Sequence, residues 1–248
     1  MIKASIPIAL CLLLLISCGK EGELTFMPLV VDKKECEECP KISIAIPKAV
    51  GQTKLAKTIN TALEEEIISL LIFDDEITIK NLDDALISFK NGYLELKERY
   101  ADETAVWEAK IEGTIRYEDA TILTIELDSY LFTGGAHGDT SERFLNFDKT
   151  KGTELENWEL FKSKADFLKF AETKFREQEA IPSDKSINHT GLMFEEDSFY
   201  LPENIGFTDK GIELLYNRYE VASYADGPII LTLPYVEVKP YLVAKLKS

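Results

Sequence analysis

The sequence predicts an α+β protein with antiparallel sheets that carry helices on one face, built as two small domains or one bipartite unit. Apolar residues recur at helical spacing over about 55–71, 82–100 and 164–179, and they alternate with polar residues in several other segments. Helical segments that are separate from groups of strand segments along the chain are typical of the α+β class. The composition, 45% hydrophobic and 29% charged over 248 residues, excludes a disordered or fibrous chain.

Residues 1–17 are predicted to be a signal peptide, because Lys3 precedes an apolar run that is too short to span a bilayer. The run ends in the sequence LISCG, which resembles the bacterial lipobox, whose cysteine is acylated and becomes the new N-terminus. We therefore expect Cys18 to be a lipid anchor. The alternative is an ordinary signal peptide that happens to contain Cys11 and Cys18.

Acylation of Cys18 would hold the protein stably on a membrane, because two or three acyl chains exceed the marginal affinity of one. Residue 19 is glycine and not aspartate, which resembles lipoproteins released to the outer membrane. We therefore expect the protein to be in the cell envelope, anchored by lipid at the outer membrane. The sequence does not distinguish the periplasmic face of that membrane from the surface face. No other apolar run reaches 18 residues, so we expect no further membrane span.

Residues 18–40 are predicted to be a lipidated tether, since their Glu, Lys, Gly and Pro residues show no sustained period. Cys36 and Cys39 lie at its end and are expected to form a local disulfide in an oxidising compartment. A redox pair would need a following helix to lower the thiol pKa, but a strand pattern follows Pro40. A metal site would need a second pair of ligands.

The first predicted domain covers residues 41–148. A strand at 41–46 precedes the helices over about 55–71 and 82–100, and the heptad-like stripe of the second helix is interpreted as core and not as a coiled coil. Alternation at 107–117 and a β-rich run at 121–132 predict a long antiparallel hairpin, followed by a strand at 144–147.

The second predicted domain covers residues 149–248 and begins in the turn sequence DKTKG. A helix from about 164 to 179 presents one aromatic face. A hairpin is expected around residues 208–211, and a strand over 228–234 is bounded by prolines.

The segment 130–138, with the sequence YLFTGGAHG, is the most distinctive in the chain. It resembles the Gly-Gly-Ala-His signature of the PdaC/RsiV-like envelope lipoproteins, which have a PdaC-type N-terminal domain and a C-terminal domain of unknown function. The blocks FTDKGI at 207–212, YEVASYADGP at 219–228 and LPYVEVKPYL at 233–242 agree with this family. The resemblance covers about residues 40–243.

The resemblance implies a modest range of functions. Family members include the accessory region of a peptidoglycan deacetylase and the lysozyme-sensing part of an anti-sigma factor. The deacetylase activity belongs to a separate metal-dependent domain, whose Asp and paired His ligands have no counterpart here, since the chain has only His137 and His189. We therefore expect no catalytic, cofactor-binding or metal-binding residues.

The glycine loop carries the candidate ligand site. Glycine permits positive φ, so the loop would turn sharply and bring backbone N–H groups close to a ligand. The alternative is a purely structural crossing in which His137 is a hydrogen-bonded wedge. The candidate ligand loop consists of Thr133, Gly134, Gly135, Ala136, His137 and Gly138.

The net charge of −16 argues against nucleic acid; an acidic surface attracts cationic partners, but acidity is equally a plain solubility feature. The expected function is a non-catalytic binding or sensing module for peptidoglycan or another glycan, or for a cationic protein such as lysozyme. The chain has no nucleophile elbow, and carboxylates are too abundant to indicate an active site. A hydrolase or deacetylase-related enzyme and a structural spacer remain as alternatives.

Overall fold

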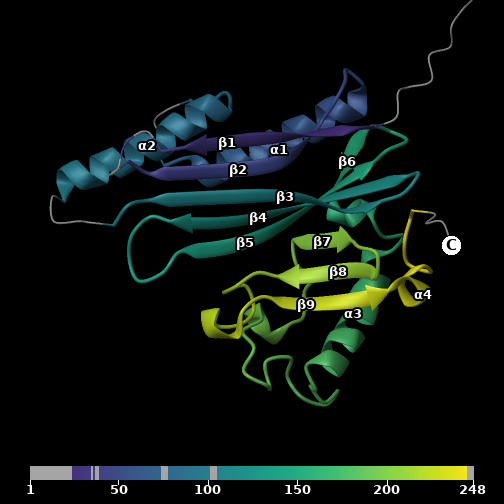
Figure 1. Cartoon of the computed structure of the whole chain (residues 1–248). Helices are drawn as coiled ribbons and strands as arrows, with labels where there is room; N and C mark the ends of the chain where they lie inside the picture. The colour runs from purple at the N-terminus through teal and green to yellow at the C-terminus, as the bar shows by residue number, and fades with distance from the viewer. Residues whose placement is uncertain (1–23, 35, 37–38, 74–77, 101–104, 245–248) are drawn as a thin grey trace, which may run out of the picture.

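The computed structural model describes residues 24–34, 36, 39–73, 78–100 and 105–244. The predicted signal peptide and Cys18 lie outside the described residues. The chain folds around two sheets, each with its own hydrophobic core (Figure 1). The α+β prediction is confirmed. In the described part of the chain, none of the helices is both long and apolar enough to cross a membrane.

The first sheet has six strands, which lie side by side in chain order. Neighbouring strands are antiparallel, except that the second and third are parallel, so the sheet is mixed and not purely antiparallel as predicted. The two helices between these strands form the crossover that a parallel pair requires. The strands are β1 (Phe26–Lys33), β2 (Lys41–Ala49), β3 (Glu108–Glu118), β4 (Ile122–Phe132), β5 (Asp139–Asp148) and β6 (Thr153–Leu155).

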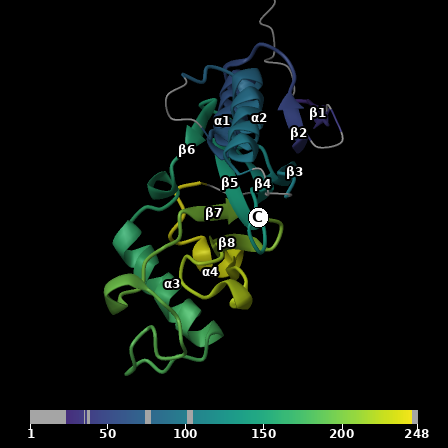
Figure 2. The same cartoon turned by 90° about the vertical axis from the view of Figure 1, so that its left-hand side faces the viewer.

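Helices α1 (Lys54–Leu71) and α2 (Leu82–Arg99) cover one face of this sheet (Figures 1 and 2). Each begins at a side chain that caps the first turn, because Thr53 accepts the Ala56 N–H and Asn81 accepts the Asp84 N–H. The apolar stripes of both helices pack into the first core, which confirms the core interpretation of the second helix.

Strand β1 corrects the tether prediction. Residues 26–33 pair with β2 over the whole strand, from Phe26↔Ala49 to Lys33↔Ile42. The strand lacks clean alternation and contains Pro28, which is tolerated because β1 lies at the sheet edge. The tether prediction of 18–40 is therefore wrong for residues 26–33, which belong to the first sheet.

The second unit contains a three-stranded antiparallel sheet and a helix, α3 (Lys164–Gln178), which buries Phe167, Ala171 and Phe175 as the aromatic face predicts. The hairpin around 208–211 and the strand at 228–234 are also present. The strands of the second unit are β7 (Asn204–Phe207), β8 (Gly211–Tyr216) and β9 (Ile229–Pro234), and β9 is followed by the short helix α4 (Tyr235–Val238). Single 3₁₀ turns lie at Asn157–Glu159, Glu195–Asp197 and Tyr224–Asp226. Strand β6, which the sequence assigns to the second domain, extends the first sheet instead.

The second unit packs on the face of the first sheet opposite to α1 and α2 (Figures 1 and 2). This contact combines apolar packing, such as the stacking of Tyr117 on Phe207, with hydrogen bonds to the backbone. The Asn146 Nδ2 of β5 donates to the Ile205 carbonyl of β7 at 2.7 Å, and the Phe144 N–H donates to Asn204 Oδ1 at 3.4 Å. This docking places a polar face of β3, β4 and β5 beside the second unit.

Candidate functional site

The candidate ligand loop, residues 133–138, connects β4 to β5. Gly134 and Gly135 have φ values of 104° and 85°, a region that favours glycine, and a Cβ on either would meet no other atom within 4 Å. Gly138 differs, because its Cβ would lie 2.3 Å from Cε2 of Tyr130, so a larger residue there would displace the half-buried Tyr130 ring. The prediction of positive φ therefore holds for two of the three glycines.

His137 links the loop to the second unit. Its ring stacks on Tyr224, with centroids 4.3 Å apart and an interplanar angle of 20°. The Tyr224 hydroxyl donates to the Gly138 carbonyl at 3.3 Å, and His137 Nδ1 lies 3.1 Å from the same oxygen. His137 is exposed and Tyr224 is half-buried, so the stacked pair presents an open edge to solvent.

Two further residues extend this edge. The Arg218 guanidinium lies over the Tyr224 ring, 5.3 Å from its centroid, and donates to the Thr140 hydroxyl of β5. Tyr219 is 60% exposed, and its ring centroid lies 5.5 Å from that of Tyr224. We call His137, Tyr219 and Tyr224 the aromatic rim.

A group of three carboxylates lies on the polar face next to the rim. Glu126 and Asp128 project from β4 and Glu142 from β5, and one oxygen of each lies within 4.8 Å of the others. Glu126 is buried, Glu142 is half-buried and Asp128 is exposed. Three converging oxygen ligands suit a hard cation such as Ca²⁺ or Mg²⁺. We call these three residues the acidic group.

The acidic group is partly neutralised by Arg116. The Arg116 Nε lies 3.2 Å from a carboxylate oxygen of Glu126, and its Nη2 lies 3.6 Å from a carboxylate oxygen of Glu213 on β8. Burial raises the pKa of Glu126 to about 7, and Arg116 opposes this shift while the neighbouring carboxylates add to it. Burial also raises the pKa of Asp128 and of Glu142.

The rim and the acidic group share one framework. Thr140 and Glu142 lie on the same face of β5, and Glu142 is four positions beyond Gly138, which is about 13 Å along a strand. The Asn217 side chain bonds both backbone groups of Glu142, accepting its N–H and donating to its carbonyl, each at 2.9 Å. The second unit therefore fixes both features against β5.

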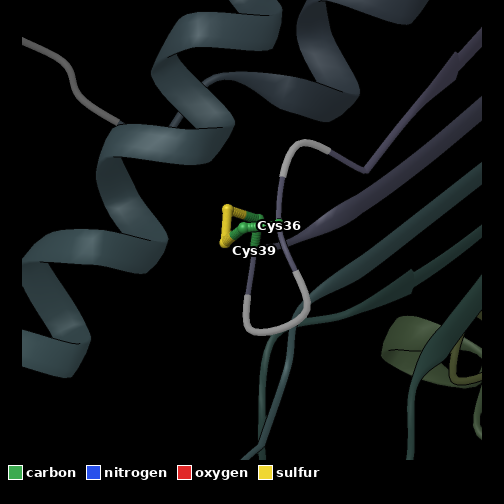
Figure 3. Close-up of a disulfide and its surroundings, with 2 residues drawn as sticks. All are labelled: Cys36 and Cys39. Carbon is green, nitrogen blue, oxygen red and sulfur yellow. A yellow bond between two sulfur atoms is a disulfide. The ribbon is translucent and has the colours of Figure 1, made fainter.

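The Cys36–Cys39 pair lies elsewhere, in the connection between β1 and β2. The structure joins the two residues by a disulfide, drawn in Figure 3, and Cys39 lines a hollow with Leu86 and Lys90 of α2. The disulfide is not part of the site formed by the loop.

The acidic group, Arg116 and Glu213 were not predicted from the sequence. The alternation in β4 was a usable signal, since it places Glu126 and Asp128 on one face, opposite to Ile125 and Leu127. No pattern in the sequence indicates that Glu142 and Glu213, from distant segments, come close to them.

Comparisons with known families define the class of protein. Residues 33–140 match the family described as "Deacetylase PdaC", and residues 159–236 match "Protein of unknown function (DUF3298)". The chain thus has a PdaC-type N-terminal domain followed by a DUF3298 domain, which confirms the resemblance drawn from the glycine loop and the C-terminal blocks.

One similar protein is the peptidoglycan-N-acetylmuramic acid deacetylase PdaC of Bacillus subtilis (strain 168). It is 26% identical over 113 residues, which are 44% of this chain and 23% of that protein. The chain therefore spans less than a quarter of the length of the curated relative that it matches.

Two solved structures share the fold. A DUF3298 family member from Bacteroides fragilis NCTC 9343 superposes with a TM-score of 0.67 and 19% identity, covering 90% of this chain and 95% of that one. A DUF3298 protein from Pseudomonas aeruginosa PAO1 gives a TM-score of 0.63 and 20% identity, covering 89% and 95%. At these identities the likeness establishes the fold.

Proposed function

We propose that this chain is a lipid-anchored binding module of the cell envelope, which recognises peptidoglycan glycan at the aromatic rim and the acidic group. The observation that carries the proposal is the stacking of His137 on Tyr224, because it joins the glycine loop of one unit to the second unit beside three carboxylates. The two matched domains indicate a cell-envelope protein related to a peptidoglycan deacetylase, and this relation supports a glycan ligand.

The chemistry of the surface suits a sugar. Aromatic rings offer a flat apolar face with a polar tip, which fits the apolar face of a pyranose ring. Carboxylates accept hydrogen bonds from hydroxyl and amide groups. A carboxylate whose pKa is raised toward neutrality can also donate a hydrogen bond when protonated, and Glu126 has such a pKa.

A cationic protein such as lysozyme is a second candidate ligand. It is favoured by the net charge of −16 and by the exposed or half-buried carboxylates of Asp128 and Glu142. Attraction of this kind weakens with salt, whereas stacking on the rim does not depend on salt in this way. Salt dependence therefore separates the two candidates.

The test measures binding of purified peptidoglycan by co-sedimentation and binding of lysozyme by pull-down. We expect His137→Ala and Tyr224→Ala to lose peptidoglycan binding, while His137→Ala leaves the melting temperature nearly unchanged because the ring is exposed. The matched control is His189→Ala, which removes the other histidine of the chain from an exposed position and should bind normally.

Wild-type protein that binds neither material at low salt would refute the proposed function. Release of soluble or deacetylated fragments, measured by mass spectrometry, would instead favour an enzyme. Anchoring is tested separately, by fractionating cells that express Cys18→Ala. A variant that stays in the membrane with an unchanged mass would refute the anchor.

A further inference from the structure

We propose that one end of the molecule, the basic end, rests directly on an anionic lipid bilayer. It is formed by five lysines around an exposed tryptophan, at the end where the N-terminal segment enters the fold. This inference rests on the proposed anchoring at Cys18 and adds an orientation to it. The basic end consists of Lys54, Lys149, Lys151, Lys162, Lys164 and Trp158.

Two adjoining hollows define this surface. The first, about 270 Å³, is lined by Leu24, Lys54, Lys149 and Lys151 among others. The second, about 570 Å³, lies between the two units and is lined by Lys151, Lys162, Lys164 and Trp158 among others. Because Lys151 borders both, the hollows form one continuous surface across β6 and the start of α3.

The charge of this surface is opposite to that of the whole protein. The two linings contain five lysines but two carboxylates, those of Asp148 and Glu159, in a chain of net charge −16. Lys149 is paired with Glu118 at 2.6 Å and Lys151 with Asp148 at 3.3 Å, so the net positive charge comes mainly from Lys54, Lys162 and Lys164. The ammonium groups of Lys54 and Lys162 donate to backbone carbonyls at 3.0 and 2.9 Å, and these neutral acceptors do not cancel their charge. The surface therefore complements an anionic bilayer.

The apolar side chains on this surface also suit a bilayer. Trp158 is 65% exposed and Val243, which lines the same hollow, is 55% exposed. Tryptophan favours the membrane interface, because its ring is apolar and its N–H can still bond to headgroups or water. The lysines would contact headgroups while Trp158 reaches the interface.

The path of the chain points to the same end. Leu24, the first described residue, lines the first hollow and is six positions beyond Cys18. Six extended residues span at most about 20 Å. Because β1 begins at Phe26, an acyl anchor on Cys18 would hold this end close to the bilayer.

The test uses Trp158 as its reporter, in full-length protein carrying Trp107→Phe so that a single tryptophan remains. We expect its emission to shift to the blue on vesicles containing phosphatidylglycerol, and much less on pure phosphatidylcholine. Measured with Cys18→Ser protein, binding should fall about fivefold on removal of Lys54, Lys162 or Lys164 alone and about 100-fold in Lys54→Gln/Lys162→Gln/Lys164→Gln.

The matched control is Lys33→Gln/Lys41→Gln/Lys110→Gln, which changes the net charge equally at the opposite end of the first sheet and should bind as well as the parent. A lipidated protein that sits on vesicles without a shift of Trp158 would overturn the basic end and leave the anchor intact. If Cys18→Ser protein binds vesicles in a charge-dependent way, and the wild-type protein is found to carry no acyl group, the basic end is supported and the anchor is refuted. A shift that depends on protein concentration and not on vesicles would assign the surface to a second copy and overturn the proposal.

Discussion

The replacement Glu126→Gln tests the electrostatics of the acidic group. Glu126 is 8% exposed and faces Arg116 from β3, Asp128 from its own strand, Glu142 from β5 and Glu213 from the second unit. Burial raises its pKa from 4.5 to about 7. The replacement keeps the shape of the side chain and removes its ability to ionise.

The sign of the effect follows from linkage. Below pH 4.5 the carboxyl is protonated in both the folded and the unfolded chain, so it costs nothing. Between pH 4.5 and about 7 the unfolded chain loses this proton and the folded chain keeps it, so the free energy of unfolding falls as the pH rises. The full loss above pH 7 is about 3 kcal/mol.

The assay is urea unfolding of both proteins at pH 5 and pH 8. We expect Glu126→Gln to have nearly wild-type stability at pH 5 and to be more stable than wild type at pH 8, by up to about 3 kcal/mol. The control is Glu95→Gln, the same change at an exposed site on α2, which should alter stability little at either pH. Equal destabilisation at both pH values would refute the reasoning, because it would show that Glu126 is ionised and stabilising throughout.

Two predictions concern stability elsewhere. Replacing Cys36 and Cys39 by serine should lower the melting temperature by only a few degrees, because the disulfide closes a loop with two intervening residues; collapse of the fold would contradict this. Gly206→Ala should lower the free energy of unfolding, measured in urea, by about 1–3 kcal/mol, because its Cβ would lie 2.5 Å from Cγ of the buried Phe144. Gly134→Ala has open space around the new Cβ but a φ of 104°, so it should lower the free energy of unfolding by about 1 kcal/mol. Wild-type stability of Gly206→Ala would contradict the tight contact between Gly206 and Phe144.

Much of the fold could be predicted because it is locally encoded. The helices of the first unit have apolar residues at regular spacing with capping residues before them, and the predicted 82–100 differs from α2 by a single residue at its C-terminal end. The hairpin of β3 and β4 follows from alternation on both sides of a turn. Strand β1 escaped prediction because an edge strand buries only part of one face, so its residues need not alternate strictly.

The candidate site could be predicted only in part, and β4 shows why. Its residues alternate as expected, with Leu123, Ile125 and Leu127 facing α1 and α2. The polar residues between them, Thr124 and Glu126, resemble the solvent face of a sheet, yet both are buried because the second unit covers that face. Alternation in a strand predicts which face of the sheet a side chain is on, but not whether another part of the chain covers that face.

Burial of this polar face is what gives the acidic group its chemistry. A carboxylate on an exposed sheet face would keep an ordinary pKa, and the raised pKa of Glu126 arises first from desolvation. That desolvation requires a second unit more than 50 residues further along the chain, and it is fixed by contacts such as those of Asn217 with the backbone of Glu142. The site is therefore a property of how two domains dock, whereas the glycine loop, which lies within one connection, could be read directly from its residues.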